Sequence, residues 1–170
     1  LEDLLVLARM ESQADELYPE EIRVPEFFAG IVADFTLMAE KKGVQLRADV
    51  SADIPALHAD PLRMEQIFTN LVGNALKFTP EGGTITLGAS AGAKEIQLWV
   101  SDTGQGILSS HLPHIFERFY RVDKGRSRDA GGTGLGLSIV KHIVRAHGGD
   151  VEAESTFGKG TTIRLRLPAS

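Results

Sequence analysis

Hydrophobic positions along this chain repeat with two different periods, which predicts a fold of alternating helices and strands. Apolar residues recur at helical spacing in 25–42, 60–78 and 135–147, and we expect a helix in each segment. The pair Asp60-Pro61 is typical of a helix start, because aspartate can cap the first free N–H groups and proline fits the first turn. Gly43 and Gly148 follow the expected ends of two helices. Shorter runs, several of them alternating, predict strands at 22–24, 44–50, 84–90, 95–101, 151–155 and 161–167.

Residues 1–17 carry an apolar stripe of their own. This helix could pack on the rest of the domain, or it could be the end of a longer helix that pairs outside the chain. We favour the second interpretation, because so short a segment has no evident partner. Tyr18 to Glu21 contains a proline and is typical of a hinge. We therefore divide the chain into 1–20 and 21–170. The apolar positions at helical spacing are Leu1, Leu4, Leu5 and Ala8.

The composition limits the classes of protein to consider. With 170 residues, 42% of them hydrophobic and 24% charged, the chain can form one well-packed domain. The formal net charge is -5 without a long basic patch, so we do not expect nucleic acid as the main partner. Cysteine is absent, which excludes disulfides and thiolate metal sites. No apolar run reaches the length of a membrane span, and a start at Leu1 instead of Met is typical of a fragment.

The helix expected at 60–78 carries a polar face. Asn70 and Asn74 are one helical turn apart, so their amides project from the same side as Lys77. An amide carbonyl is a hard oxygen ligand that suits Mg²⁺, an ion that keeps several waters and bridges substrate phosphates. The alternative is that both asparagines are simply solvated. The opposite, apolar stripe is expected to comprise Leu62, Ile67, Leu71, Ala75 and Phe78.

Two glycine-rich stretches follow, DTGQG at 102–106 and GTGLGL at 132–137. Glycine lets backbone N–H groups approach phosphate closely, and the second stretch leads into a helix whose start favours anions. Asp102 ends an apolar strand, where its carboxylate could accept a hydrogen bond from an exocyclic amine such as that of adenine. Alternatively it caps the strand in an Asx-type turn. Ile107 would offer an apolar wall to a flat base, and together these features predict a site for a nucleotide triphosphate.

The segment between the glycine stretches, 107–133, is expected to form a mobile lid. An aromatic and basic cluster at 115–121 could anchor it while a basic tip at 124–131 reaches phosphates; the alternative is a solvated basic loop. Other nucleotide motifs fail on context. The stretch 158–160 breaks a Walker A pattern, and Gly132 follows a charged loop instead of a strand. We find no zinc-ligand spacing among the histidines and no nucleophile–base pair.

Taken in order, these motifs resemble the N, G1, F, G2 and G3 boxes of sensor histidine kinases. The resemblance covers 21–168 and implies an α/β fold, a two-layer sandwich of the Bergerat type that DNA gyrase shares. Its mixed, mostly antiparallel sheet of about five strands would be backed by three helices and carry an ATP lid. Residues 1–17 are similar to the end of the second helix of the family's dimerisation hairpin. The matching segments are 70–78, 102–106, 116–121, 132–137 and 158–161.

The resemblance also implies roles for individual positions in binding Mg-ATP. Asn74 would be the Mg²⁺ ligand and Asn70 its helper at the phosphates. Lys77 and Arg121 would touch the outer phosphates and, with Asn70, form the catalytic group. Asp102 would hold the adenine amine. The expected nucleotide contacts are Asn70, Asn74, Lys77, Phe78, Asp102, Gly104, Gly106, Ile107, Phe119, Tyr120, Arg121, Gly132, Thr133, Gly134, Leu135, Gly136, Leu137 and Thr161.

Two further features of the family bear on the chemistry. Phe116 and Phe119 would seat the lid, and Thr161 would support the adenine side. No histidine here has the setting of the family's phosphate acceptor, since His58 and His111 lie in loop-like contexts, so we expect ATP binding without self-phosphorylation. Related ATPases carry a general-base glutamate where this chain has an asparagine one turn before the expected Mg²⁺ ligand, and slow hydrolysis is therefore expected.

The resemblance extends to partners and location. The γ-phosphate would pass to a histidine on the dimerisation domain and then to a response regulator. The full-length protein would be a homodimer and the fragment a monomer. This part would be cytoplasmic, with the full protein anchored in a bacterial inner membrane. Two alternatives stay open: a serine-directed kinase of the anti-sigma-factor kind, which typically lacks the attached helix, and a degenerate nucleotide fold used only for docking.

Overall fold

The computed structural model describes residues 4–5, 8, 16–122 and 134–169. Most of the expected 1–17 helix and part of the expected lid lie outside these ranges, so the division at residue 20 stays a prediction. The described helices are α2 (Val24–Lys42), α3 (Pro61–Phe78) and α4 (Gly136–Ala146), with a 3-10 turn at Leu112–His114. The strands are β1 (Glu20–Ile22), β2 (Gln45–Asp49), β3 (Leu57–Ala59), β4 (Thr84–Ala91), β5 (Glu95–Asp102), β6 (Asp150–Thr156) and β7 (Gly160–Pro168).

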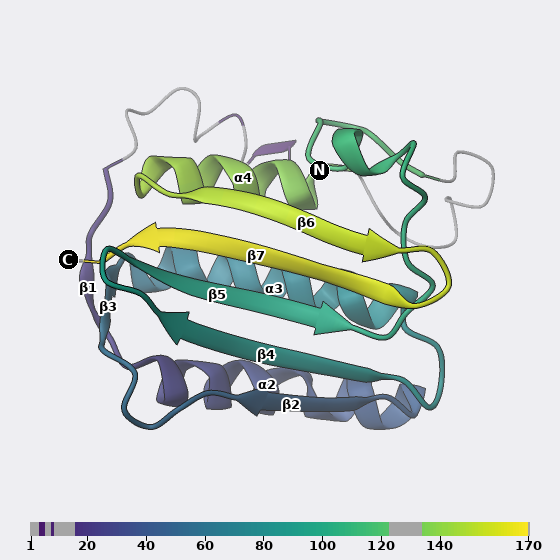
Figure 1. Ribbon diagram of the computed structural model, residues 1–170, viewed down its shortest axis with the longest axis horizontal. Helices are drawn as coiled ribbons and strands as arrows, with labels where there is room; N and C mark the ends of the chain where they lie inside the picture. The colour runs from purple at the N-terminus through teal and green to yellow at the C-terminus, as the bar shows by residue number, and fades with distance from the viewer. Residues whose placement is uncertain (1–3, 6–7, 9–15, 123–133, 170) are drawn as a thin grey trace.

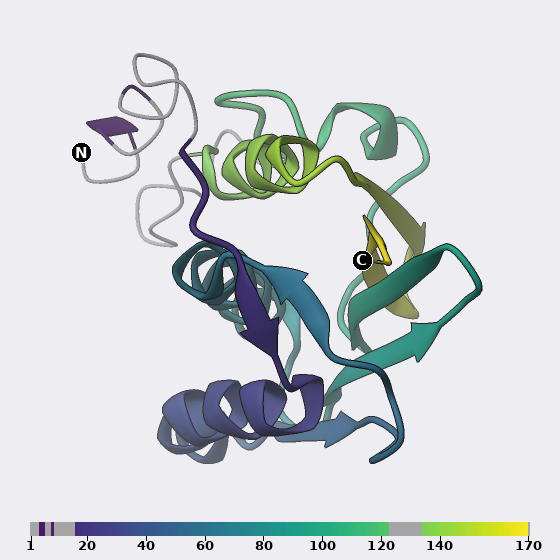
Figure 2. The same cartoon turned by 90° about the vertical axis from the view of Figure 1, so that its left-hand side faces the viewer.

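The main sheet has five strands in the order β2-β4-β5-β7-β6. Strands β2 and β4 are parallel, and every other neighbouring pair is antiparallel. A parallel pair needs a crossover connection, and α3 lies in the one between β2 and β4. Figures 1 and 2 show that α2, α3 and α4 all lie on one face of this sheet. The predicted two-layer sandwich with a mixed sheet and three helices is confirmed.

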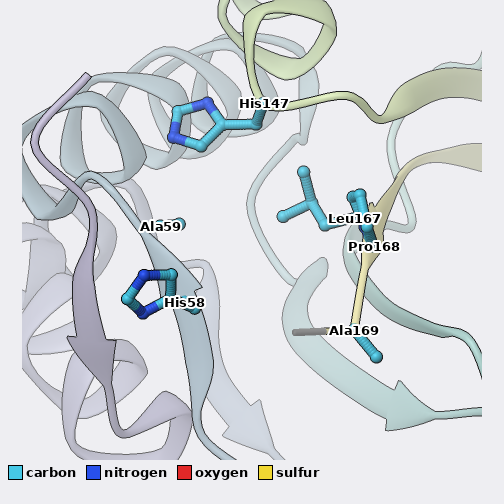
Figure 3. A pocket seen from close by; sticks show the side chains of 6 residues that line it. All are labelled: His58, Ala59, His147, Leu167, Pro168 and Ala169. Carbon is cyan, nitrogen blue, oxygen red and sulfur yellow. The ribbon is translucent and has the colours of Figure 1, made fainter.

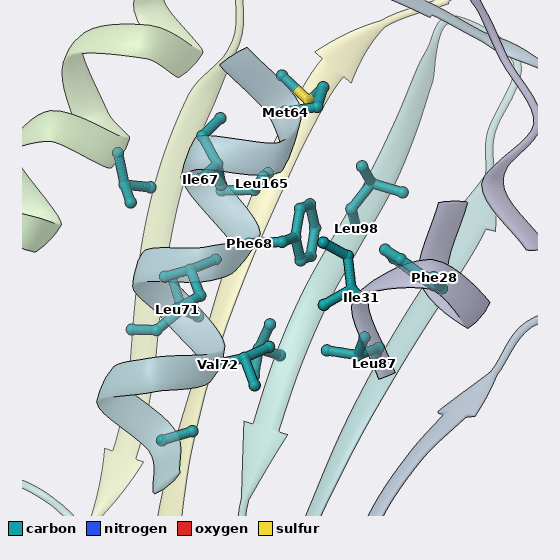
Figure 4. Packing of buried hydrophobic residues seen from close by; sticks show 14 of the residues in the cluster. Phe28, Ile31, Met64, Ile67, Phe68, Leu71, Val72, Leu87, Leu98 and Leu165 are labelled. Carbon is teal, nitrogen blue, oxygen red and sulfur yellow. The ribbon is translucent and has the colours of Figure 1, made fainter. Parts of the chain in front are cut away.

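The core lies between the helices and the sheet. Leu87, Leu98 and Leu165, on adjacent strands β4, β5 and β7, are almost completely buried, as are Phe28 of α2 and Phe68 of α3. The rings of the two phenylalanines meet edge to face, with centroids 5.1 Å apart (Figure 4). Burying each of these side chains contributes about 1.5–3 kcal/mol. This shared core holds α3, which carries the predicted polar face, firmly against the sheet.

Both ends of α3 are held by side chains. Asp60 caps the start, where its Oδ1 accepts a hydrogen bond from the backbone N–H of Arg63 at 3.2 Å. At the other end, the Lys42 ammonium of α2 donates to the carbonyl oxygens of Leu76 and Lys77. A cation at this end also complements the helix dipole. The predicted range of α3 is therefore confirmed apart from its capping residue.

The predicted apolar stripe of α3 is wrong at two positions. Leu62 is 71% exposed, because it shares the solvent side of the helix with Glu65 and Thr69. Phe78 is 41% exposed in the last turn, where the Lys77 ammonium lies 5.3 Å from the centre of its ring. The buried stripe comprises Met64, Ile67, Phe68, Leu71, Val72, Ala75 and Leu76.

A small second sheet ties the start of the domain to α3. The strand predicted at 22–24 is wrong in position: β1 ends at Ile22, and α2 begins at Val24. Its partner β3 was not predicted, and β3 places His58 in a strand instead of a loop. The backbone N–H of Tyr18 donates to Oδ2 of Asp60 at 3.0 Å, so the predicted hinge is attached to the domain.

The other helices and strands predicted within 24–122 and 134–169 agree with the structure to within one or two residues at each end. Across the described part of the chain, no helix combines the length and apolar character that a membrane crossing requires.

Candidate nucleotide-binding site

The polar face of α3 lies beside the start of α4. Asn70, Asn74 and Lys77 are half-buried, whereas Leu71 on the other side is 3% exposed. A Cβ atom added to Gly136 would lie 3.5 Å from Oδ1 of Asn70, which shows how closely α4 approaches. Among the described residues, none makes a hydrogen bond to either asparagine amide. Both amides are thus positioned at a junction of two helices and are available to a ligand.

The start of α4 has the properties of an anion site. Leu135 occupies the capping position, and within the described residues no side chain caps this end. The first N–H groups of α4 therefore lack helix partners and carry the positive end of the helix dipole. Ser138 donates to the carbonyl of Leu135 at 2.7 Å, which holds the turn without using those N–H groups. Leu137 packs against the core and helps to seat the helix.

Asp102 lies at the end of β5, opposite Thr161 of β7. Its Oδ1 accepts hydrogen bonds from the backbone N–H of Gly104 at 2.8 Å and of Thr161 at 3.3 Å. The first of these is the Asx-type turn that the sequence left as an alternative. No described residue forms a hydrogen bond to Oδ2, so the turn uses one carboxylate oxygen and leaves the other for a ligand.

The turn after Asp102 is fastened to the last turn of α3. The backbone N–H of Gln105 donates to the carbonyl of Phe78 at 3.3 Å. A Cβ atom at Gly104 would lie 2.6 Å from that same carbonyl oxygen, so a side chain at this position would force the two elements apart. Asp102 is therefore held next to the helical turn that carries Asn74 and Lys77.

The turn between β6 and β7 packs against the other side of this loop. Gly106 has a φ of 73°, and a Cβ atom there would lie 2.2 Å from the carbonyl oxygen of Thr156. The backbone N–H of Ile107 donates to Oγ of Ser155 at 2.7 Å, and Ser155 Oγ lies 2.8 Å from Oγ1 of Thr161. Ser155 thus joins two predicted site residues. Sequence reasoning missed it because a serine inside a strand has no distinguishing spacing.

The pKa values of Asp102 and Lys77 are shifted in opposite directions. Burial raises the pKa of Asp102, although the N–H groups of Gly104 and Thr161 partly offset this effect. Burial also lowers the pKa of Lys77, and the nearby positive charge of Arg121 lowers it further. Two cations beside each other, one of them partly desolvated, favour the approach of an anion.

The base of the expected lid is partly as predicted. Phe116 packs against the core, but Phe119 is 60% exposed, so the prediction that both rings seat the lid is wrong for Phe119. The Phe119 backbone has a φ of 63°, a region that costs a non-glycine residue about 1–3 kcal/mol. Its N–H donates to the carbonyl of Gly134 at 2.9 Å. Gly132 and Thr133, two of the predicted contacts, lie outside the described residues.

A hollow of about 200 Å³ lies at the opposite end of the sheet (Figure 3). His58, His147 and Leu167 are among its lining residues, and none of the predicted nucleotide contacts belongs to it. His147 uses both ring nitrogens there: Nδ1 lies 2.8 Å from the carbonyl of Ile143, and Nε2 accepts from the backbone N–H of Asp60 at 3.1 Å. This histidine therefore stabilises the junction of α4 and α3.

Comparison with known proteins agrees with the fold. Residues 59–170 match the family model of histidine kinase-, DNA gyrase B- and HSP90-like ATPases. The chain therefore belongs to this family. It is 40% identical over 168 residues to the sensor histidine kinase WalK of Bacillus subtilis (strain 168), which covers 98% of this chain and 27% of that protein. It is 34% identical over 167 residues to the adaptive-response sensory kinase SasA of Synechococcus elongatus, and this match covers 98% of this chain and 43% of that protein.

A solved structure supports the same assignment. The chain matches full-length ShkA, crystallised in complex with AMPPNP, with a TM-score of 0.89 and 32% identity over 99% of this chain and 35% of that one. The chain thus spans less than half the length of each of these three proteins. Within its family it is the catalytic ATP-binding domain of a sensor histidine kinase, as the order of its motifs predicted.

Proposed function

We propose that this domain binds Mg-ATP on the polar face of α3 and delivers the γ-phosphate to a histidine on a separate dimerisation domain. In that step a bond forms between the γ-phosphorus and an imidazole nitrogen, the bond to the β-phosphate's bridging oxygen breaks, and ADP leaves. The observation that carries the proposal is the junction itself. The half-buried amides of Asn70 and Asn74 lie between the start of α4, which no described side chain caps, and the turn of the half-buried carboxylate of Asp102.

The two ends of the junction suit the two ends of ATP. Oδ2 of Asp102 would accept a hydrogen bond from the adenine amine, with Ile107 as apolar wall and Thr161 supporting the carboxylate. Lys77, Arg121 and the first N–H groups of α4 would bind phosphate oxygens. The remaining predicted contacts would bind the nucleotide through backbone groups that approach it closely. Catalysis would depend on positioning and charge neutralisation, because phosphoryl transfer needs little covalent chemistry from the protein.

The residues present fit a magnesium ion that arrives with the nucleotide. Oδ1 of Asn74 is a hard oxygen donor on the same face as Asn70, and Mg²⁺ prefers to complete its shell with water and phosphate oxygens. Within the described residues, no three His, Cys, Asp or Glu side chains gather as a metal-binding cluster. Asn74 would therefore hold the ion, and the ion would neutralise phosphate charge.

The proposal extends to partners and location, and it is supported by the likeness to sensor kinases. Residues 1–20 would be the end of the dimerisation hairpin helix with its hinge, and 21–170 the catalytic domain. The partners would be the protein's own dimerisation domain and the receiver domain of a response regulator. The full-length protein would be a homodimer with this domain in the cytoplasm and an anchor in the inner membrane, while the fragment would be monomeric.

A two-step assay tests the proposal. A non-hydrolysable ATP analogue is titrated against the chain with and without Mg²⁺, and γ-labelled ATP is then supplied with a separate hairpin domain that carries the acceptor histidine. We expect Mg²⁺-dependent binding and an acid-labile label on the hairpin. Asn74→Ala should abolish the effect of Mg²⁺ on affinity, whereas Thr69→Ala, an exposed position on the same helix, should not.

Each alternative gives a different result. An acid-stable label on a serine would favour the serine-directed kinase. Binding without transfer to any acceptor would favour a docking module. Failure of the wild-type chain to bind the analogue would overturn the proposed function altogether.

A further inference from the structure

His111 forms a contact that neither its sequence context nor the proposed function explains. It begins the turn before the 3-10 segment, where its backbone N–H donates to the carbonyl of Leu108 at 2.9 Å and its carbonyl accepts from His114 at 2.9 Å. Its ring is half-buried, and Nδ1 lies 2.5 Å from the hydroxyl oxygen of Tyr120. This is a short hydrogen bond between side chains nine positions apart.

Tyr120 is held by more than this bond. Its ring lies near two imidazoles, with its centroid 6.0 Å from that of His111 and 5.3 Å from that of His114. Its backbone N–H donates to the carbonyl of Glu117 at 3.3 Å. His114 is held in turn, because its Nδ1 lies 2.8 Å from Oε1 of Glu117. The tyrosine side chain is therefore immobilised by the segment that precedes it.

The contact between His111 and Tyr120 matters for the site because of the residues that flank Tyr120 in the chain. On one side, Phe119 adopts a φ of 63° and bonds to Gly134, so the backbone turns sharply there. On the other side, Arg121 lies close enough to Lys77 to lower the pKa of that lysine. Tyr120 thus lies between a sharp backbone turn at Phe119 and the cation of Arg121, which is expected at the phosphates. The position of Tyr120 therefore sets the direction in which the backbone continues to Arg121.

We propose that His111 is a positioning residue of the nucleotide site: it holds Tyr120 through the Nδ1–hydroxyl hydrogen bond and thereby places Arg121 beside Lys77 for phosphate binding. This inference rests on the proposed function, because it assumes that Lys77 and Arg121 receive phosphates. His111 acts through another residue and does not touch the nucleotide. The effect on affinity should match the loss of one hydrogen bond, which is about 2- to 10-fold.

A double-mutant cycle on the whole chain tests the proposal with the non-hydrolysable ATP analogue and Mg²⁺. His111→Phe removes the bond and keeps a ring, and Tyr120→Phe removes the hydroxyl. We expect His111→Phe to weaken binding about 2- to 10-fold, and the double variant to bind no more weakly than Tyr120→Phe alone. His111→Asn, which retains a hydrogen-bonding atom near the place of Nδ1, should restore most of the affinity.

Controls separate positioning from simple loss of structure. His58→Phe changes an exposed histidine of β3, at the opposite end of the sheet, and should bind like the wild type. Circular dichroism checks that each variant is folded at the temperature of the titration. Additive losses in the double variant, or a His111→Asn variant as weak as His111→Phe, would overturn the inference while the proposed function stands. A wild-type chain that does not bind the analogue would overturn both.

Discussion

At the scale of single residues, Asp102 shows how one carboxylate can serve structure and recognition together. One oxygen receives two backbone N–H groups, and the other is not bonded by any described residue. The turn that appeared as an alternative to adenine binding is thus compatible with it. The sequence could identify the aspartate at the end of an apolar strand. It could not show that Oδ1 accepts the backbone hydrogen bonds and that Oδ2 is the oxygen left for a ligand.

We predict that Asp102→Asn weakens ATP binding about 5- to 150-fold, the equivalent of about 1–3 kcal/mol for an unsatisfied polar pair. Asparagine can still accept from the N–H of Gly104 with its oxygen. Its NH₂ group would then face the adenine amine, donor against donor. Calorimetric titration of the ATP analogue measures the loss. Unchanged affinity would show that this carboxylate does not contact the base.

Asp102 should also give stability a pH dependence. Burial raises the pKa of Asp102 above its ordinary 3.8, so the folded chain binds this proton more tightly than the unfolded chain. The contribution of Asp102 to the free energy of unfolding therefore falls as pH rises from 3.8 through the raised pKa, and Asp102→Asn should remove this fall. The hydrogen bonds that lower the pKa of Asp60 act in the opposite direction, so the measurement is the difference between wild type and variant in denaturant unfolding. A constant difference across that interval would contradict the prediction.

At the scale of elements, the glycines are explained by contacts between segments. Gly106 and Gly82 both have positive φ, at 73° and 88°, but only Gly106 is in close contact with another backbone. Either glycine would have been assigned to a turn from sequence. Only the folded position of the β6–β7 turn shows that Gly106, and not Gly82, has no room for a side chain.

We predict that Gly106→Ala weakens ATP binding and lowers stability more than Gly82→Ala. Both substitutions place alanine in the left-handed region, which costs about 1–2 kcal/mol. Only Gly106→Ala adds an overlap, because its Cβ would lie 2.2 Å from the carbonyl oxygen of Thr156. Thermal unfolding and analogue titration of both variants measure the difference. Equal effects would show that backbone strain alone matters.

The two short strands, β1 and β3, could not be predicted correctly from the sequence. Strand β3 has three residues with an exposed histidine between two buried side chains, which is too short to establish a period. The first strand was placed too late, because Val24 continues the apolar run yet belongs to α2. Both strands exist because they pair with each other and lie beside the capping residue Asp60. That pairing joins segments more than thirty residues apart, so no local pattern contains it.

At the scale of the whole molecule, one core supports both ends of the sandwich. α4 starts beside Asn70 at the candidate site and ends at His147, which accepts a hydrogen bond from Asp60. Asp60 in turn binds the backbone of Tyr18, where the chain enters the domain. The entry of the chain and the candidate site are therefore connected through α3 and α4, whose buried side chains belong to the same core.

We predict that Phe68→Ala lowers the free energy of unfolding by about 3–5 kcal/mol, because it leaves a cavity between α2, α3 and the sheet. Phe157→Ala is the matched control, since that ring is 63% exposed and its loss should change stability by less than about 0.5 kcal/mol. Chemical denaturation of both variants measures the difference. Similar values would mean that Phe68 is not at the centre of the core.

The sequence by itself determined the long helices, the main strands and the order of the motifs, because hydrophobic period, caps and glycine spacing are local properties. It also determined the chemistry of the candidate site, since side-chain type sets what amides, carboxylates and cations can bind. The tertiary structure alone decided which sides those groups face. It partly buried Asp102 and shifted its pKa, exposed Leu62 and Phe119, joined Ser155 to Thr161, and brought His111 to Tyr120. Burial and contact depend on segments that meet only when the chain is folded, and no spacing along the sequence records them.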